Sequence, residues 1–436
     1  MKEYYFISDL HIGGDAELDI CDFELELIEF LKELEEKDKN TELIIVGDVF
    51  GFWELTGMEG IEKLATIAGK HRELFDQFRK TGENITITVL PGNHDYSLAS
   101  DPAFSKALAE YNMRLEPREH IIREVEGKKI WIEHGNQHDS FNRAAKFGDP
   151  YVTPFGYYVT SQIVSTTGRH ATFGKSQWLK DLESVQPLEY IPDWLLSNYF
   201  YREMSPILRW IMLPFLILFT ISMIAFVGMI LEQESILGTT IFNREFLGSF
   251  GIFGKLFGLV LMVDFVIIIF LILLSIPLGL IYRDIMKTLR RFGLKIGKDS
   301  NAVVTDVYTE AAEKIFARDL SVVVYLFGHT HNPSLRKVAG RVIINTGTWL
   351  KRLIRIRAWI RLMPDIYYPT FCLNYFRIYG ENGRIVIKYQ KISHDPPSGL
   401  TLLQRLMIIG KKRKHIVKIP DRTEIVVDPP LPRPLL

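Results

Sequence analysis

Short apolar runs alternate with amphipathic ones along the first 135 residues. Each apolar run leads directly into polar or turn-forming residues, as in KEYYFISDL, TELIIVGDV, NITITVLPGNHD and KKIWIEHGN. After the first of these runs, apolar residues recur on one face of a helical pattern at Phe23, Leu27, Phe30, Leu31 and Leu34. Strands that alternate with helices predict a layered α/β domain.

Two long apolar runs follow a segment that lacks clear periodicity. The segment begins near Asp149 and is rich in Tyr, Phe, Gly, Ser and Thr, and the runs are Trp210–Leu231 and Phe265–Tyr282, neither of which contains a charge. About 20 apolar residues cross the core of a bilayer. We therefore expect transmembrane helices at about 208–231 and 257–282. The alternatives are buried core helices of a soluble protein, or a hairpin that enters the membrane without crossing it.

The strand pattern returns after the apolar runs. SVVVYLFGHTH and RVIINTGTW each end an apolar run with polar residues, and NYFRIYGENGRIVIKYQKI predicts a β-hairpin about Asn382-Gly383. We expect one α/β domain in two parts, residues 1–148 and 301–395. An insertion of residues 149–300 would divide it, with an aromatic cap segment and the two apolar helices. Residues 396–436 form a basic and Pro-rich tail.

Charge and cysteine content narrow the class of protein. The chain has 52 Lys plus Arg and 52 Asp plus Glu, so it shows no overall bias toward nucleic acid, which we do not expect as a partner. Cys21 and Cys372 are its two cysteines, and they suggest neither a disulfide framework nor a thiolate metal site. The N-terminal MKEYYFISDL reads as a strand, so we expect no cleavable signal peptide.

Basic residues predict the orientation of the apolar runs. Arg202 and Arg209 precede the first run, and Arg283 and Lys287 follow the second. An excess of Lys and Arg marks the cytoplasmic side. The prediction is a protein of the cell membrane with two spans and with the catalytic domain and both termini in the cytoplasm. The basic stretches 351–361 and 411–415 are either solvated faces or contacts with anionic head groups.

The predicted strands end on residue types that bind metals. In an α/β sheet, ligands gather outside the carboxyl ends of the strands, so these side chains should converge. Carboxylate, imidazole and carboxamide donors without sulfur suit Mn²⁺, Fe²⁺ or Zn²⁺, and the number of donors suits two ions. The candidate ligands are Asp9, His11, Asp48, Asn93, His134, His329 and His331.

The ordered motifs D-x-H, G-D, G-N-H-D, H-G and G-H-x-H resemble those of the calcineurin-like metallophosphoesterase superfamily. The resemblance implies a four-layer α-β-β-α sandwich, two divalent ions, most often Mn²⁺, and hydrolysis of a phosphate ester or pyrophosphate. It implies that Asp48 bridges the ions, and that His94 acts in catalysis with Asp95 orienting its ring. By the same resemblance one ion is bound by Asp9, His11 and His331, and the other by Asn93, His134 and His329.

Within this superfamily the chain resembles UDP-2,3-diacylglucosamine pyrophosphatases. It shares SDLH, the stretch GDVFGFW that ends at Trp53, and an insertion between the H-G and G-H-x-H motifs. In those enzymes the insertion receives acyl chains but is usually smaller and does not span a membrane, and Arg stands at the position of His94. Trp53, His138 and Asp139 are candidate substrate-binding residues.

The expected function is therefore that of a membrane-anchored hydrolase with a dinuclear metal centre and a lipid-linked or nucleotide-lipid substrate. A membrane-tethered phosphodiesterase or phosphatase for soluble nucleotides or phosphoproteins is an alternative. A non-catalytic scaffold with the same fold is another, although scaffolds usually lose ligands. The sequence leaves the substrate, the native metals and the oligomeric state open.

Overall fold

The structure, a computed structural model, forms two compact units, which are described separately. The first unit comprises Met1–Ser197, Lys298–Ala358 and Asp365–Leu436, and the second comprises Asn198–Gly297 and Trp359–Pro364. The residues described are 2–13, 21–158, 160–161, 178, 181, 184–185, 190–236, 238, 248–291, 300–361, 363–394, 399–411 and 418–426. Most of the predicted aromatic cap, most of the basic cluster 411–415 and the Pro-rich end of the tail lie outside these residues.

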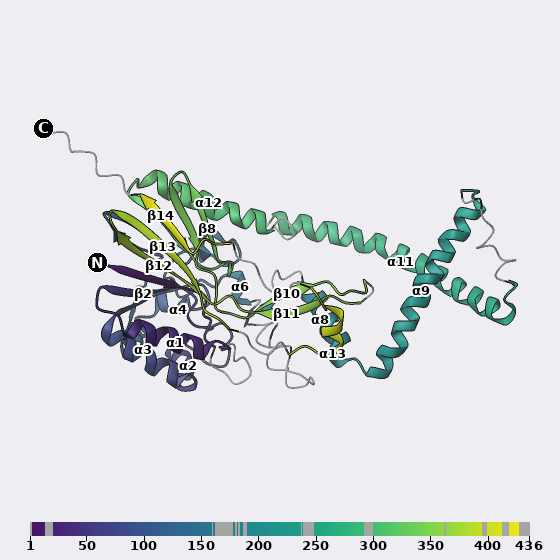
Figure 1. Ribbon diagram of the computed structural model, residues 1–436, viewed down its shortest axis with the longest axis horizontal. Coiled ribbons are helices and arrows are strands. Elements are labelled where there is room, and N and C mark those ends of the chain that lie inside the picture. The colour runs from purple at the N-terminus through teal and green to yellow at the C-terminus, as the bar shows by residue number, and fades with distance from the viewer. Residues whose placement is uncertain are drawn as a thin grey trace. The chain divides into compact units, whose positions relative to one another are not determined.

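A seven-stranded mixed sheet is the larger sheet of the first unit, in the order β14-β13-β12-β1-β2-β3-β4 (Figure 1). Strands β1 to β4 run parallel to one another, and β12 joins β1 antiparallel, followed by β13 and β14. The strands are β1 (Glu3–Ile7), β2 (Thr41–Val46), β3 (Thr86–Leu90), β4 (Met113–Leu115), β12 (Asn374–Glu381), β13 (Arg384–Lys391) and β14 (Arg422–Val426).

A five-stranded sheet has the order β5-β6-β7-β9-β8. Its three central strands, β6, β7 and β9, are parallel, and β5 and β8 pair antiparallel at the two edges. The strands are β5 (His120–Val125), β6 (Lys128–Glu133), β7 (Val322–Phe327), β8 (Ser334–Val338) and β9 (Arg341–Asn345). Because β6 precedes the predicted insertion and β7 follows it, the two halves of the sequence meet in this sheet.

The two sheets pack face to face between helices. Alternate residues of β1 divide between two cores: Tyr5 packs toward the helices and Phe6 toward the second sheet. On the other side, Tyr308 and Phe316 of α12 (Ser300–Arg318) cover the five-stranded sheet. These layers agree with the predicted four-layer sandwich. The helices over the larger sheet are α1 (Glu24–Glu35), α2 (Ile61–Lys70), α3 (Arg72–Asn84) and α5 (Ala103–Ala109), with α4 (Ser97–Ser100) just before α5.

Two local predictions are confirmed in this unit. Helix α1 buries Leu27, Phe30, Leu31 and Leu34 on one face. The hairpin of β12 and β13 turns at Asn382-Gly383, whose φ angles of 51° and 71° are those of a two-residue turn that matches the twist of the strands.

A small β-ribbon completes the first unit. It consists of β10 (Arg352–Ile356) and β11 (Ile366–Thr370). Leu353 and Tyr367 of this ribbon pack against Val185 and Trp194, which belong to the region predicted as an insertion. The remaining short elements are η1 (Asn136–His138), α6 (Phe155–Tyr158), α8 (Ile191–Asn198) and α13 (Leu402–Met407).

The second unit is built from two apolar helices, α9 (Pro206–Gln233) and α11 (Gly251–Arg291), after a π-helical turn, η6 (Tyr199–Glu203). Ser222 of α9 donates a hydrogen bond to the carboxylate of Asp264 in α11, and both side chains are buried. Among the described residues, Gly251–Asp284 is the one helix long and apolar enough to cross a membrane, and Phe219–Gln233 is a shorter apolar helix. The structure thus supports one candidate span where the sequence predicts two.

Candidate metal centre

The predicted ligands converge beyond the carboxyl ends of the strands. Asp9 and His11 follow β1, Asp48 follows β2, Asn93 follows β3, His134 follows β6, and His329 and His331 follow β7. Donor atoms of Asp9, His11 and His331 lie within 4.8 Å of one another, as do those of Asp48, His134 and His329. The structure therefore brings both predicted ligand sets together, and their role as metal ligands stays a prediction.

The backbone at these strand ends is strained. Several site residues have positive φ angles, which L-residues other than Asn and Asp rarely adopt. Each such residue costs on the order of 1–3 kcal/mol, so it persists only where the surrounding structure holds it, and such residues cluster at functional sites. The residues and angles are Asp9 (53°), His11 (46°), Asp48 (51°), His329 (63°) and His331 (56°).

Asp9 is held by one carboxylate oxygen and presents the other to the cluster. Its Oδ2 accepts hydrogen bonds from the Ser8 hydroxyl and from the backbone N–H of His329, the latter at 3.1 Å. Its Oδ1 lies 3.2 Å from Nε2 of His331. Within the described part of the chain, this buried Oδ1 has no hydrogen-bond partner. A carboxylate oxygen buried in this way is available to a cation.

The two carboxylate oxygens of Asp48 also face different partners. Its Oδ1 accepts the backbone N–H of His94 at 2.8 Å. Its Oδ2 lies 3.1 Å from Nε2 of His134 and 3.6 Å from Nε2 of His11. Since His11 and His134 belong to different predicted ligand sets, Asp48 stands between them, as a bridging ligand would.

His134 is oriented by its second ring nitrogen. Nδ1 donates to the carbonyl oxygen of Val46 at 2.8 Å, which turns Nε2 toward Asp48 and toward Oδ1 of Asn93, 3.1 Å away. A hydrogen bond from the remote nitrogen to a backbone carbonyl is typical of metal-binding histidines. Burial lowers the pKa of His134, but the charge of Asp48 and the hydrogen bond to it outweigh burial and raise the pKa to about 10.

Glycines beside the ligands leave space for these side chains. A Cβ atom at Gly92 would lie 2.1 Å from Oδ1 of Asp48, and one at Gly328 would lie 2.6 Å from Oδ2 of Asp9. Both positions require close approach of the backbone to a ligand. The glycines of the G-N-H-D and G-H-x-H motifs therefore have a steric role, because a larger residue would collide with the side chain of Asp48 or of Asp9.

His94 lies against the cluster, and its ring is held by residues that the sequence did not all identify. Its ring centroid is 4.3 Å from that of His11, and Trp53 stacks on it at 4.2 Å. Nδ1 of His94 lies 3.1 Å from Oε1 of Glu54, which is 1% exposed. Glu54 was not predicted as a site residue. The only sequence signal is its place directly after GDVFGFW.

Asp95 has backbone partners in the structure, whereas its role in orienting the His94 ring stays a prediction. Oδ2 of Asp95 accepts the backbone N–H groups of Val49 and Phe50 at 2.7 and 3.2 Å, and Oδ1 accepts that of Gly92 at 2.6 Å. With both oxygens taken by backbone donors, the carboxylate joins the loops that carry Asp48 and Asn93. Burial and then the charge of Asp48 raise the pKa of Asp95 to about 7, against the effect of these hydrogen bonds.

Asp139 and His138 each lie within hydrogen-bond distance of another side chain of the first unit. Asp139 lies 3.0 Å from Nε2 of His329, and His138 lies 2.7 Å from Oε1 of Glu133. Burial would raise the pKa of Asp139, but its interactions with His329 lower it to about 2. Asp139 therefore touches a predicted ligand, whereas contact of Asp139, His138 or Trp53 with substrate stays a prediction.

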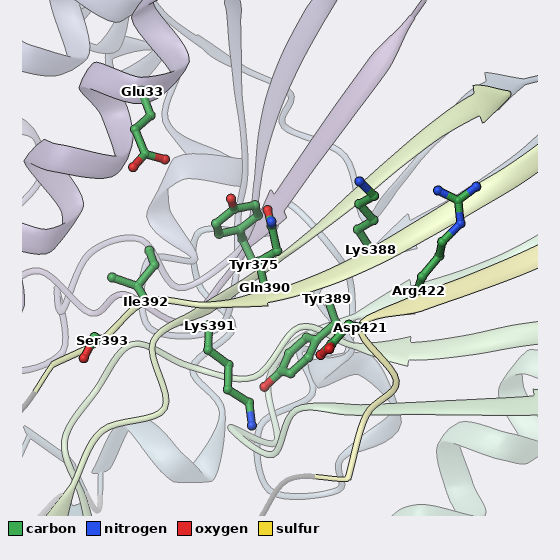
Figure 2. A pocket seen from close by; sticks show the side chains of 10 residues that line it. All are labelled: Glu33, Tyr375, Lys388, Tyr389, Gln390, Lys391, Ile392, Ser393, Asp421 and Arg422. Atoms are coloured by element: carbon green, nitrogen blue, oxygen red, sulfur yellow. The ribbon is translucent and has the colours of Figure 1, made fainter.

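A surface hollow elsewhere in the first unit is lined by none of the predicted site residues (Figure 2). It has Lys388, Lys391 and Arg422 on its walls together with Glu33 and Asp421. Its walls thus carry both positively and negatively charged side chains.

The part of the chain that contains most of these site residues matches a known protein family. Residues 3–206 match the family model described as Calcineurin-like phosphoesterase. This match supports the calcineurin-like phosphoesterase superfamily. The superfamily in turn supports a metal-dependent phosphoester hydrolase in general terms, which agrees with the Asp and His groups of the cluster. No curated protein matches the sequence.

Solved structures give low-scoring matches. A single mutant of Vps29 from Entamoeba histolytica is 9% identical, covering 89% of this chain and 92% of that one, with a TM-score of 0.27. Wild-type Vps29 complexed with Zn²⁺ from the same organism is 10% identical, covering 89% and 92%, with a TM-score of 0.27. A predicted phosphoesterase from Streptococcus pneumoniae TIGR4 is 10% identical, covering 92% and 94%, again with a TM-score of 0.27.

Proposed function

We propose that the chain is a dinuclear-metal phosphohydrolase, anchored in the membrane, whose substrate is a lipid-linked or nucleotide-lipid phosphoester or pyrophosphate at the cytoplasmic leaflet. The observation that carries the hydrolase part is the position of Asp48, with one oxygen facing both His11 and His134. A shared carboxylate between two imidazole-containing sets is the arrangement that two adjacent cations require.

The donors fit two divalent cations, for which we propose Mn²⁺. When bound, such cations neutralise charge on the phosphoryl oxygens and make water a stronger nucleophile near neutral pH. Asp48 would be shared between the two cations. The other ligands would be Asp9, His11 and His331 for one cation, and Asn93, His134 and His329 for the second.

His94 is the proposed general acid. In hydrolysis the oxygen of water bonds to phosphorus, the bond from phosphorus to the leaving oxygen breaks, and that oxygen takes up a proton. His94 is adjacent to His11 and its side chain is 16% exposed, so it can reach a substrate at the cluster. Glu54 lies within hydrogen-bond distance of Nδ1, and Trp53 stacks on the ring, so these two residues hold the ring in place.

The apolar unit supports the membrane part of the proposal. Many large apolar side chains of α11 are exposed, among them Phe270, Leu273 and Ile276. The carboxylate of Asp264, by contrast, is buried against Ser222. A helix with an apolar surface and its acidic group turned inward suits a lipid environment. Extraction of cell membranes with alkaline carbonate tests this anchor: the full chain should stay with the lipid, and a chain lacking residues 206–291 should be released.

Phosphorus NMR of detergent-purified protein with Mn²⁺ tests the function. The wild type should release phosphate-containing products from members of a panel of lipid-linked phosphoesters and diphosphates, and Asp48→Ala and His331→Ala should not. Good cleavage of soluble phosphodiesters with no cleavage of any lipid-linked compound would reject the lipid substrate while retaining the hydrolase.

A further inference from the structure

Cys21, Glu24 and His71 form a second cluster of metal-binding residue types in the first unit. One donor atom from each, the thiol sulfur, a carboxylate oxygen and a ring nitrogen, lies within 4.8 Å of the other two. Cys21 comes just before helix α1, Glu24 is the first residue of that helix, and His71 stands between α2 and α3. The sequence does not indicate such a site, because 47 positions separate Glu24 from His71.

The ring of His71 is oriented as the ring of a metal ligand would be. Its Nε2 lies 2.7 Å from the carbonyl oxygen of Gly13, and its Nδ1 lies 2.7 Å from Oε2 of Glu24. A carbonyl oxygen can only accept a hydrogen bond, so Nε2 carries a proton. A hydrogen bond from the remote nitrogen to a backbone carbonyl is typical of metal-binding histidines. His134 of the strand-end cluster, the one that contains Asp48, makes the same kind of bond with the roles of its two nitrogens exchanged.

The contact between Nδ1 of His71 and the Glu24 carboxylate requires a positive charge. With one proton on Nε2, the neutral ring offers a lone pair at Nδ1, and the carboxylate also offers only lone pairs. Either a second proton on the ring or a cation between the two groups removes this conflict. The nearby sulfur of Cys21 favours the cation, because thiolate is a preferred ligand of zinc and of softer metal ions.

The burial of the three side chains suits a small divalent ion. Cys21 and His71 are buried, whereas 29% of the Glu24 side chain is exposed, so an ion can enter from solvent at the carboxylate. One thiolate, one imidazole and one carboxylate suit four-coordinate Zn²⁺, with water at the fourth position. Zinc–ligand bonds of about 2.0–2.3 Å place the ligand atoms about 3–4 Å apart, so Nδ1 and Oε2 need to separate by less than about 1 Å.

We propose that Cys21, Glu24 and His71 bind one Zn²⁺, which shares no ligand with the two cations of the strand-end cluster. Binding forms one bond from zinc to each of the three side chains and releases the thiol proton to solvent. The role of the ion is structural. Nε2 of His71 holds the carbonyl of Gly13, two residues after the predicted ligand His11, so the ion fastens the chain that follows β1 to helices α1 and α3. This inference does not depend on the proposed function.

Cobalt substitution tests the site, because a thiolate bound to Co²⁺ gives a charge-transfer band in the near ultraviolet and the strand-end cluster contains no sulfur. Co²⁺ is titrated into the metal-free full chain in detergent. The wild type should show the band, and Zn²⁺, which binds such sites more tightly, should abolish it. Cys21→Ser should lack the band, whereas Cys372→Ser, the same change at the other cysteine, should retain it.

Variants of the other two ligands measure their part in the site. His71→Gln and Glu24→Gln should each weaken Co²⁺ binding, followed by the band, by at least about 10-fold, since the loss of a group that only hydrogen-bonds a metal ligand already costs that much. Asp48→Asn should keep the band, which distinguishes this site from the strand-end cluster and separates the inference from the proposed function.

Three results would overturn the assignment: no band in the wild type with excess Co²⁺, a band that survives Cys21→Ser, or a band that is lost in Cys372→Ser. Circular dichroism verifies that each variant is folded. If Cys21→Ser does not fold, because its side chain is buried, the other two ligands decide. An unchanged affinity for Co²⁺ in both His71→Gln and Glu24→Gln would then reject the site and leave the contact between the two side chains as an ion pair.

Discussion

The carboxylate of Glu54 lies 3.1 Å from Nδ1 of His94, at the one histidine of the cluster for which the sequence predicts a catalytic rather than a ligand role. Glu54 is almost completely buried, and Trp53 covers the face of the same ring. The contact between Glu54 and His94 is of the kind that the sequence predicts for Asp95 and His94. Glu54 is therefore a positioning residue for His94.

Glu54→Gln should lower kcat by about 10-fold to 100-fold and change KM little, because it replaces the carboxylate that contacts Nδ1 of His94 but keeps the shape of the side chain. Steady-state kinetics with Mn²⁺ on bis(4-nitrophenyl) phosphate measure both constants. A kcat equal to that of the wild type would show that the Glu54 contact does not support catalysis.

Asp95→Asn should lower the free energy of unfolding by about 1–3 kcal/mol, since an amide cannot accept all three of the backbone N–H groups that the carboxylate accepts. Urea unfolding of the Mn²⁺-containing protein measures this change. If stability stayed the same and kcat fell, the result would contradict this structural role and favour the prediction that Asp95 acts through His94.

Gly92→Ala should abolish activity, because its new Cβ atom would lie 2.1 Å from Oδ1 and 2.4 Å from the backbone nitrogen of Asp48. Gly57→Ala is the matched control, since nothing lies within 4 Å of a Cβ atom there. Metal content and hydrolysis of the two variants give the comparison. Normal metal content in Gly92→Ala would mean that the backbone adapts and that Asp48 is not fixed by this contact.

Metal binding should release a proton from His134. The ring's pKa is raised to about 10, so its protonation contributes stability fully below pH ~6.5 and loses that contribution as pH rises through about 10. A divalent cation needs the unprotonated nitrogen and must displace this proton. Calorimetry near pH ~8, in buffers that differ in ionisation enthalpy, should find more protons released by wild type than by His134→Gln. The same release from both would contradict this.

Much of the fold follows from local patterns in the sequence. The periodicity of Leu27, Leu31 and Leu34 predicts helix α1, and Asn382-Gly383 predicts the hairpin of β12 and β13. Motifs of polar residues after apolar strands predict that Asp9 and His331 meet, although 320 or so positions separate them, because parallel strands bring their carboxyl ends to one edge of a sheet.

The contacts of the site that could not be predicted from the sequence depend on the direction in which side chains point. Asp95 directly follows His94, but neighbouring side chains need not face each other, and the carboxylate turns to the backbone of Val49 instead.

The central claim is that the strand-end cluster holds two cations and hydrolyses phosphoesters. The most direct measurement combines metal analysis with Mn²⁺-dependent hydrolysis of bis(4-nitrophenyl) phosphate for wild type and Asp48→Asn. We expect about two equivalents of Mn²⁺ per chain in the wild type, and a loss of both tight Mn²⁺ binding and turnover in a folded Asp48→Asn protein. Less than one equivalent in an active wild type, or full activity in Asp48→Asn, would contradict it.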